Sequence, residues 1–286
     1  MRAAGFTLIE LIVTTAILAI LSVITALFVV RPLEGYFDSR RRAELTDVAD
    51  TALRRFGRDV RLALPNSVRV ATNAGGTYIE MLTMKTGGRY RAAPDDSVGT
   101  AEDFLDFTAA DSSFDTLGPM SAVAGQVVAA GDLVVVHNLG IAGASAYLGN
   151  NRSAVTGFVA GGGAIAGEDR IGIDPFLFPV ESPGRRFQVV SGPTTFECLP
   201  GPVDGEGNGT GVLRRVSHYD IQAAQPTGTY AGTPQSALLA QYVSACTIDY
   251  TDLPLQARGL AAIRLTLTRG NEAVSLYYEA QVRNVP

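Results

Sequence analysis

The sequence predicts an α+β protein in which one long N-terminal helix packs on a C-terminal, antiparallel β-sheet head. Residues 6–30 form an apolar run whose single charged residue is Glu10. Apolar residues then recur at three- and four-residue spacing as far as Leu64, as in an amphipathic helix. After Pro65 the pattern changes to short β-type runs separated by Gly, Pro, Asn and Asp. A chain of 286 residues accommodates this helix and one globular domain.

The apolar run is long enough to cross a membrane. Its 25 residues would reach about 37 Å as a helix, against about 30 Å for a hydrocarbon core. A cleaved secretory signal has a shorter apolar region and a small-residue cleavage site after it. A simple anchor for a periplasmic enzyme is the alternative interpretation of the same segment.

Residues 31–64 predict an amphipathic continuation of the helix, which Pro32 either kinks or restarts. The apolar stripe comprises Leu45, Val48, Ala49, Ala52, Leu53, Phe56, Val60 and Leu64. The opposite face, expected to meet solvent or a partner, carries Arg41, Glu44, Asp47, Asp50, Arg54, Arg55, Arg58 and Asp59. The triple Arg40-Arg41-Arg42 suits either anionic lipid head groups or a solvated helix face, and the solvated face is favoured.

The head shows strand signals at several places. They are residues 78–84, 133–137, 186–190, 196–199, 212–219 and 242–250. Residues 263–267 and 274–282 alternate in polarity around Gly270-Asn271, which predicts a closing β-hairpin with one buried face. Between these strands, residues 92–118 are expected to form turns and Asp-capped loops, and the Gly- and Ala-rich residues 140–167 a long loop.

The composition gives little support to an enzyme or a nucleic-acid-binding protein. His137 and His218 are the only histidines, each in a β-type run, and no G-x-S-x-G motif is present. Nothing in the sequence indicates a cofactor. Beyond Pro65 there are 14 basic and 21 acidic residues, an acidic balance that argues against nucleic acid as a partner.

A calcium loop is a weak candidate at Asp204, Glu206 and Asn208, because oxygen ligands alternate and Gly209 is sixth. Arg215 stands where the twelfth-position Glu would be, so a plain hairpin loop is favoured and no metal site is assigned. The two cysteines, Cys198 and Cys246, predict one disulfide in an oxidising compartment, with two buried thiols as the alternative.

The N-terminus carries the most specific motif. A short leader, Met1-Arg2-Ala3-Ala4-Gly5, precedes Phe6-Thr-Leu-Ile-Glu10 and the apolar run. This arrangement resembles the prepilin leader of type IV pilins and pseudopilins. The resemblance implies that prepilin peptidase cleaves between Gly5 and Phe6 and methylates Phe6, and that Glu10 guides filament assembly by pairing with a neighbour's N-terminus. The alternative role for Glu10 is a capping box with Thr7.

Further stretches resemble the MshO-type minor pilins of the mannose-sensitive haemagglutinin (MSHA) pilus. They are residues 54–61, 63–67, 137–140, 146–147, 213–214, 246–250 and 283–286, with the Cys198 strand. Where major pilins commonly carry a kinking proline, this chain has Leu27. The resemblance implies a leader (1–5), a membrane and filament-core helix (6–30), its amphipathic continuation (31–64) and a β-rich head (65–286).

That resemblance also implies a function. It indicates a structural, non-enzymatic minor pilin that initiates or caps a fibre. The chain would first be a single-pass inner-membrane protein in contact with lipid, with its head in the periplasm, and later part of a surface pilus. Implied partners are prepilin peptidase, the inner-membrane assembly platform, and major and other minor pilins. The alternatives are a type II secretion pseudopilin and a tip adhesin that binds a ligand through residues 92–118 or 140–167.

Overall fold

The computed structural model describes residues 7–26, 28, 31–94, 103–253 and 258–286, and the bounds below refer to them. Two helices, α1 (Leu8–Thr25) and α2 (Arg31–Arg61), precede a sheet built from eleven strands. The strands are β1 (Arg69–Asn73), β2 (Gly76–Arg89), β3 (Asp111–Asp115), β4 (Leu133–Val136), β5 (Arg152–Val159), β6 (Arg170–Phe176), β7 (Arg186–Leu199), β8 (Gly211–Tyr219), β9 (Gly232–Leu253), β10 (Arg258–Arg269) and β11 (Glu272–Arg283).

All strand pairs are antiparallel, and the main path runs β11-β10-β9-β8-β7-β4-β5-β6-β3, with β2 on β7 and β1 on β2. The expected helix and antiparallel sheet are therefore confirmed, and the sheet is larger than an ordinary pilin head. The C-terminal hairpin is also confirmed, since β10 and β11 pair throughout around Gly270-Asn271.

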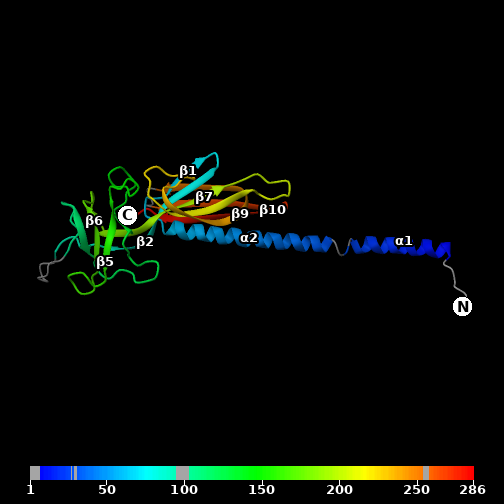
Figure 1. The fold of residues 1–286 in the computed structure, drawn as a ribbon, viewed down its shortest axis with the longest axis horizontal. Coiled ribbons are helices and arrows are strands. Elements are labelled where there is room, and N and C mark those ends of the chain that lie inside the picture. The colour runs from blue at the N-terminus through cyan, green and yellow to red at the C-terminus, as the bar shows by residue number, and fades with distance from the viewer. Residues whose placement is uncertain (1–6, 27, 29–30, 95–102, 254–257) are drawn as a thin grey trace.

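The head consists of two lobes joined by the long strands β2 and β7 (Figure 1). In what we call the proximal lobe, residues 77–82 of β2 pair with residues 193–198 of β7, beside β1, β8–β11 and α2. In the distal lobe, the far ends of β2 and β7 meet β3–β6, which lie in the chain between these two strands. The distal lobe occupies the end of the molecule opposite α1.

The helix α2 packs its apolar stripe on the proximal sheet. Leu45, Ala49, Ala52, Leu53, Phe56 and Val60 are all buried in one core with β2 and β7–β11. Phe56 meets Phe196 of β7 edge-to-face, with 5.2 Å between ring centroids. The expectation for Val48 is wrong: it is 41% exposed, because it borders an open hollow of about 460 Å³ that Leu238 of β9 also lines.

The ends of α2 explain how the chain leaves the helix. Pro32 is the second residue of α2, in the first turn, where a proline costs no helical hydrogen bond. At the other end α2 stops at Arg61, three residues before the expected Leu64. There the Leu64 N–H donates to Leu82 of β2 and the Leu62 carbonyl accepts from Met84. Bonds to the sheet thus replace the last helical bonds.

The prediction that Asp59 belongs to the solvated face of the helix is wrong. It is only 3% exposed, and its carboxylate lies 2.6 Å from Arg215 Nε on β8 and 3.3 Å from Arg55 Nε. Arg215 also donates to Ser217 and Thr194. A buried carboxylate is stable only when paired and hydrogen-bonded, so this ion pair fixes the helix against one position of the sheet.

The distal lobe contains strands where the sequence indicated turns and loops. β3 lies within residues 92–118 and β5 within residues 140–167, and β6 was not predicted at all. β5 contains Gly157 and β6 contains Gly172, residues with low strand propensity. Pairing of β5 with β4 and β6 supplies the ladder hydrogen bonds that local sequence does not predict. A separate core fills this lobe, with Phe114 and Phe187 in edge-to-face contact at 5.1 Å.

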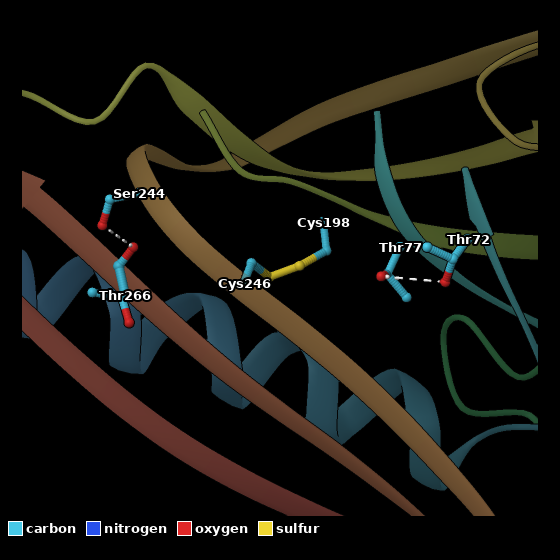
Figure 2. Close-up of a disulfide and its surroundings, with 6 residues drawn as sticks. All are labelled: Thr72, Thr77, Cys198, Ser244, Cys246 and Thr266. Carbon is cyan, nitrogen blue, oxygen red and sulfur yellow. Dashed lines mark hydrogen bonds between the residues drawn. A yellow bond between two sulfur atoms is a disulfide. The ribbon is translucent and has the colours of Figure 1, made fainter. Parts of the chain in front are cut away.

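Cys198 of β7 and Cys246 of β9 form a disulfide with 5.9 Å between their Cα atoms (Figure 2). Both residues are buried in the core beneath α2. The bond closes a loop across 48 positions of sequence and joins strands on either side of β8.

Replacing Asp59 should strongly destabilise the proximal lobe. In Asp59→Ala the largely buried Arg215 guanidinium loses its carboxylate, and breaking a buried pair in this way typically costs about 3–5 kcal/mol of unfolding free energy. Denaturant titration of the full chain in detergent measures this loss. The matched control is Asp50→Ala, whose ion pair with Arg54 is solvent-exposed, and whose unfolding midpoint should stay near that of the parent. Equal midpoints for the two variants would contradict the role given to Asp59.

Removing the disulfide should lower stability without changing the fold. For a loop of 48 positions, the chain-entropy relation gives about 4 kcal/mol. The double variant Cys198→Ser/Cys246→Ser, compared with the oxidised parent by denaturant titration, measures the loss. Reduction of the parent provides the control, because it should reproduce the variant's midpoint. A parent whose midpoint is insensitive to reductant would contradict the expectation.

Candidate membrane-spanning and assembly segment

The helix α1 begins at a capped N-terminus. Thr7 has an extended backbone (φ −84°, ψ 149°), and its side-chain oxygen accepts a hydrogen bond from the Glu10 N–H at 3.3 Å. Its carbonyl accepts from Glu10 and Leu11. This arrangement is how Thr satisfies the free donors of a first helical turn. Glu10 therefore lies in that turn, where a negative charge is favoured by the helix dipole.

The hydroxyl groups of α1 are satisfied by the helix itself. Each donates to a backbone carbonyl four residues earlier at 2.8–2.9 Å: Thr14 to Glu10, Thr15 to Leu11, Ser22 to Leu18 and Thr25 to Leu21. In lipid, where water cannot solvate polar groups, such internal bonds make hydroxyl groups tolerable. Among the described residues of α1, only Glu10 carries a charge.

No residue of α1 is buried, so the other described residues cover none of it. Leu8 is 77% and Leu18 is 62% exposed. The 18 residues of α1 span about 27 Å, close to a hydrocarbon core of about 30 Å. It is the one helix in the described part of the chain that is long and apolar enough to cross a membrane.

The Glu10 carboxylate has no hydrogen-bond or ion-pair partner within the described residues, so only the Thr7 half of the possible capping box is present. A carboxylate in a membrane costs about 2.5–3.5 kcal/mol at the bilayer centre and less near the interface. Glu10 is thus available to a cation from outside the described part of the chain. Gly5 and Phe6, the predicted cleavage and methylation positions, lie outside the described residues, as does Leu27.

The three consecutive arginines of α2 have acidic neighbours. Arg40 Nε lies 3.1 Å from Glu44, Arg41 contacts Asp38, and Arg42 Nε lies 2.5 Å from Glu272 of β11. Arg40 and Arg42 are well exposed. These contacts fit the solvated-face interpretation, because each guanidinium already has a carboxylate of its own chain.

Several stretches that lie far apart in the sequence meet at the junction of the two lobes. The Asn138 side chain donates to the Pro65 carbonyl at 2.7 Å and accepts from Ala146 N at 2.9 Å. The Tyr147 hydroxyl donates to the Ser67 carbonyl at 2.9 Å. Three further contacts complete the network, namely Asn66 Nδ2 to Asn138 O, Asn66 N to Asn284 Oδ1, and Asn284 Nδ2 to the Tyr250 hydroxyl. Residues that are scattered along the sequence therefore join the end of α2, the distal lobe and the C-terminus.

The remaining candidates for chemistry are separated in space. His137 follows β4, which ends one residue earlier than predicted, and its Nδ1 is buried without a partner among the described residues, so burial lowers its pKa. His218 is exposed on β8. Burial would raise the pKa of Asp115, but hydrogen bonds from Arg170, Ala164 and Asp103 outweigh it and lower that pKa. The Arg170 guanidinium lies 2.7 Å from Asp115 and 3.5 Å from Asp103, which makes this pair of carboxylates an ion-pair network.

The weak calcium candidate lies in the β7–β8 hairpin loop. Asp204 Oδ1 accepts from the backbone N–H groups of Glu206 and Asn208 at 2.9 and 2.8 Å. Asn208 Oδ1 accepts from Gly270 N at 3.0 Å in the β10–β11 turn. These oxygens thus shape the loop and attach it to the neighbouring hairpin. No cluster of three or more His, Cys, Asp or Glu able to hold a metal occurs among the described residues.

Comparison with protein families finds one match. Residues 1–26 match the model of the prokaryotic N-terminal methylation motif. No curated protein and no solved structure matches the chain. The matched motif supports a type IV pilin-like protein that prepilin peptidase processes, that associates with other pilins, and that is anchored in a membrane by α1. Proteins with this motif are structural rather than enzymatic.

The two roles considered for Glu10 predict different outcomes for two variants. If Glu10 acts in assembly, Glu10→Gln should enter the membrane and be cleaved normally but fail to enter pili, because the amide cannot pair with an amine cation. Thr7→Ala removes the side-chain cap, typically worth about 1 kcal/mol, and should still assemble. Immunoblots of sheared pili and membranes measure both. Equal loss of assembly in both variants would show that capping is the dominant role.

Proposed function

We propose that the chain is a minor pilin of an MSHA-like type IV pilus, present in few copies and acting at initiation or at the tip. One observation carries the proposal. A prepilin-type motif at residues 1–26 includes an apolar helix, α1, that the other described residues leave uncovered, and α2 and a β-rich head follow it in the chain.

In this proposal Glu10 becomes paired only when the subunit joins the fibre. Cleavage after Gly5 would give Phe6 a cationic amine, which N-methylation leaves charged. The carboxylate of an incoming subunit, without a partner in its own described residues, would bind the amine of a neighbour already in the fibre. Because an unpaired charge is costly in an apolar environment, only the axial register that pairs it would be stable.

The distal lobe supports a position at the end of the fibre. It lies beyond the C-terminal end of α2, on the side away from α1 (Figure 1). In a fibre whose subunits stack with parallel helices, the neighbouring subunit on the tip side lies in that same direction. A lobe that extends there would occupy the space of that neighbour, whereas the subunit at the tip of the fibre has none. This geometry favours a capping role with low copy number.

Processing gives the first test. The membrane-extracted protein should lack the five leader residues and carry one methyl group on Phe6, as measured by intact-mass and N-terminal peptide spectrometry. A Gly5→Val variant, with a bulky residue at the cleavage position, should retain Met1. Finding Met1 on the parent protein would favour a simple membrane anchor instead.

Deletion gives the second test. A clean deletion should abolish surface pili, scored by electron microscopy, and leave secreted proteins in the same cultures unchanged. Loss of secretion with intact pili would assign the protein to the type II machinery. Immunogold labelling should mark fibre ends, and label spread evenly along the fibres would contradict the tip position.

A further inference from the structure

A hollow of about 300 Å³ lies on the face of the proximal sheet that is turned away from α2. Its lining includes Tyr78 of β2, Glu197 and Leu199 of β7, Arg214 and Val216 of β8, and Tyr230 of the loop between β8 and β9. Phe196 and Leu213 lie in the core beneath α2. Successive side chains of a strand point to opposite faces, so Glu197 and Arg214 belong to the other face. The hollow has the size of a site for one small ligand.

Two opposite charges line this hollow without forming an ion pair. Glu197 of β7 is directly opposite Arg214 of β8. Opposite charges at such positions ordinarily stabilise a sheet by pairing, since their Cβ atoms are about 4.5–5.5 Å apart. Here Arg214 is exposed and has no acidic partner among the described residues. The guanidinium is therefore available to a ligand in the hollow.

Glu197 contributes a carboxylate oxygen that is open to the hollow. The residue is only 5% exposed, and its Oε1 accepts a hydrogen bond from the Tyr230 hydroxyl at 2.8 Å. Its Oε2 has no partner among the described residues, and it is not closed off from the hollow that Glu197 lines. A carboxylate that has left most of its water needs donors on both oxygens. Oε2 thus calls for a donor from outside the described chain.

The wall of the hollow is held in place before any ligand arrives. The ring of Tyr230 lies 4.6 Å from that of Tyr219, measured between centroids. In the same loop, the Gln225 side chain donates to the Tyr78 carbonyl at 2.9 Å. Burial, followed by the hydrogen bond to Glu197, raises the pKa of Tyr230, so its phenol remains a donor. The Glu197 carboxylate is therefore fixed in orientation.

We propose that this hollow binds a free α-amino acid with an apolar side chain. The ammonium group of the ligand donates to Glu197 Oε2, and its carboxylate accepts from the planar donors of Arg214. The side chain of the ligand contacts Leu199 and Val216. A ligand with a single charge leaves one of the two protein charges without a partner, whereas an α-amino acid carries both charges on one carbon. The proposal goes beyond the pilus role and gives the proximal lobe a ligand.

The test is a ligand-observed NMR titration of the purified full chain in detergent micelles, at low ionic strength and about pH 6.5, where α-amino groups are charged. L-leucine is the probe. N-acetyl-L-leucine lacks the ammonium, L-leucinamide lacks the carboxylate, and glucose is the neutral polyol. We expect leucine to bind at least about tenfold more tightly than each of the others, the difference that one charge-assisted hydrogen bond supplies. This assay needs no pilus, so its result is independent of the assembly proposal.

Two variants assign each charge of the ligand to one residue. Glu197→Gln should weaken leucine binding by about tenfold or more and leave N-acetyl-leucine unchanged, because that analogue has no ammonium to lose. Arg214→Gln should weaken leucine binding similarly and leave leucinamide unchanged. Arg264→Gln, which removes an exposed cation near the Tyr277 ring elsewhere in the proximal lobe, is the matched control and should bind leucine as the parent does.

Several results would overturn the proposal. Absence of a leucine signal would reject it outright, and leucine affinity unchanged in both variants would place binding elsewhere. Equal affinity for leucine and either analogue would show a site that uses one charge alone. Tighter binding of glucose would identify a polyol site. Because Arg214 is exposed, its variant keeps the test decisive even where Glu197→Gln folds poorly.

Discussion

The exposure of α1, which no other described part of the chain covers, is the constraint on which the rest of the molecule depends. Fully burying one Leu or Ile side chain is worth about 1.5–3 kcal/mol, and α1 exposes many of them, among them Leu8 and Leu18. Water cannot be the environment of this helix. Lipid surrounds the helix before assembly, and in the proposed function the helices of other subunits surround it afterwards. In that proposal the single charge at Glu10 would make the second environment selective, because apolar packing alone has no preferred register.

The head holds α2, the helix that follows α1 in the chain, in one rigid body. The stripe of α2 packs on the proximal sheet, the Asp59–Arg215 ion pair fixes its position, and the Cys198–Cys246 disulfide closes the same core. A force applied along α1 would therefore be transmitted to the sheet through buried contacts. The distal lobe is an insertion between β2 and β7, and these two continuous strands connect it to the proximal lobe without a flexible linker.

Polar side chains lie where the two lobes meet and on the β2–β7 ribbon of the distal lobe. At the junction, the Asn138 and Tyr147 side chains satisfy backbone carbonyls that would otherwise be buried unpaired. Close by, Arg69 pairs with the buried Glu80 at 2.6 Å and stacks on Tyr147. Burial nonetheless raises the Glu80 pKa. On the β2–β7 ribbon, Arg89 and Arg186 instead lie directly opposite each other without an acidic partner in the described chain, and Arg89 Nε donates to the Gly184 carbonyl.

The features that the amino-acid sequence alone determines are those that depend on local periodicity. The apolar run, the stripe of α2 and the alternating C-terminal hairpin were predictable, because each pattern reports which face of one element avoids water. The burial of Asp59 and the exposure of Val48 were not, since both depend on where β8 and β9 lie relative to the helix. Likewise, β3, β5 and β6 are strands because neighbours supply their hydrogen bonds. Tertiary pairing alone placed Arg89 opposite Arg186, about a hundred positions later in the chain.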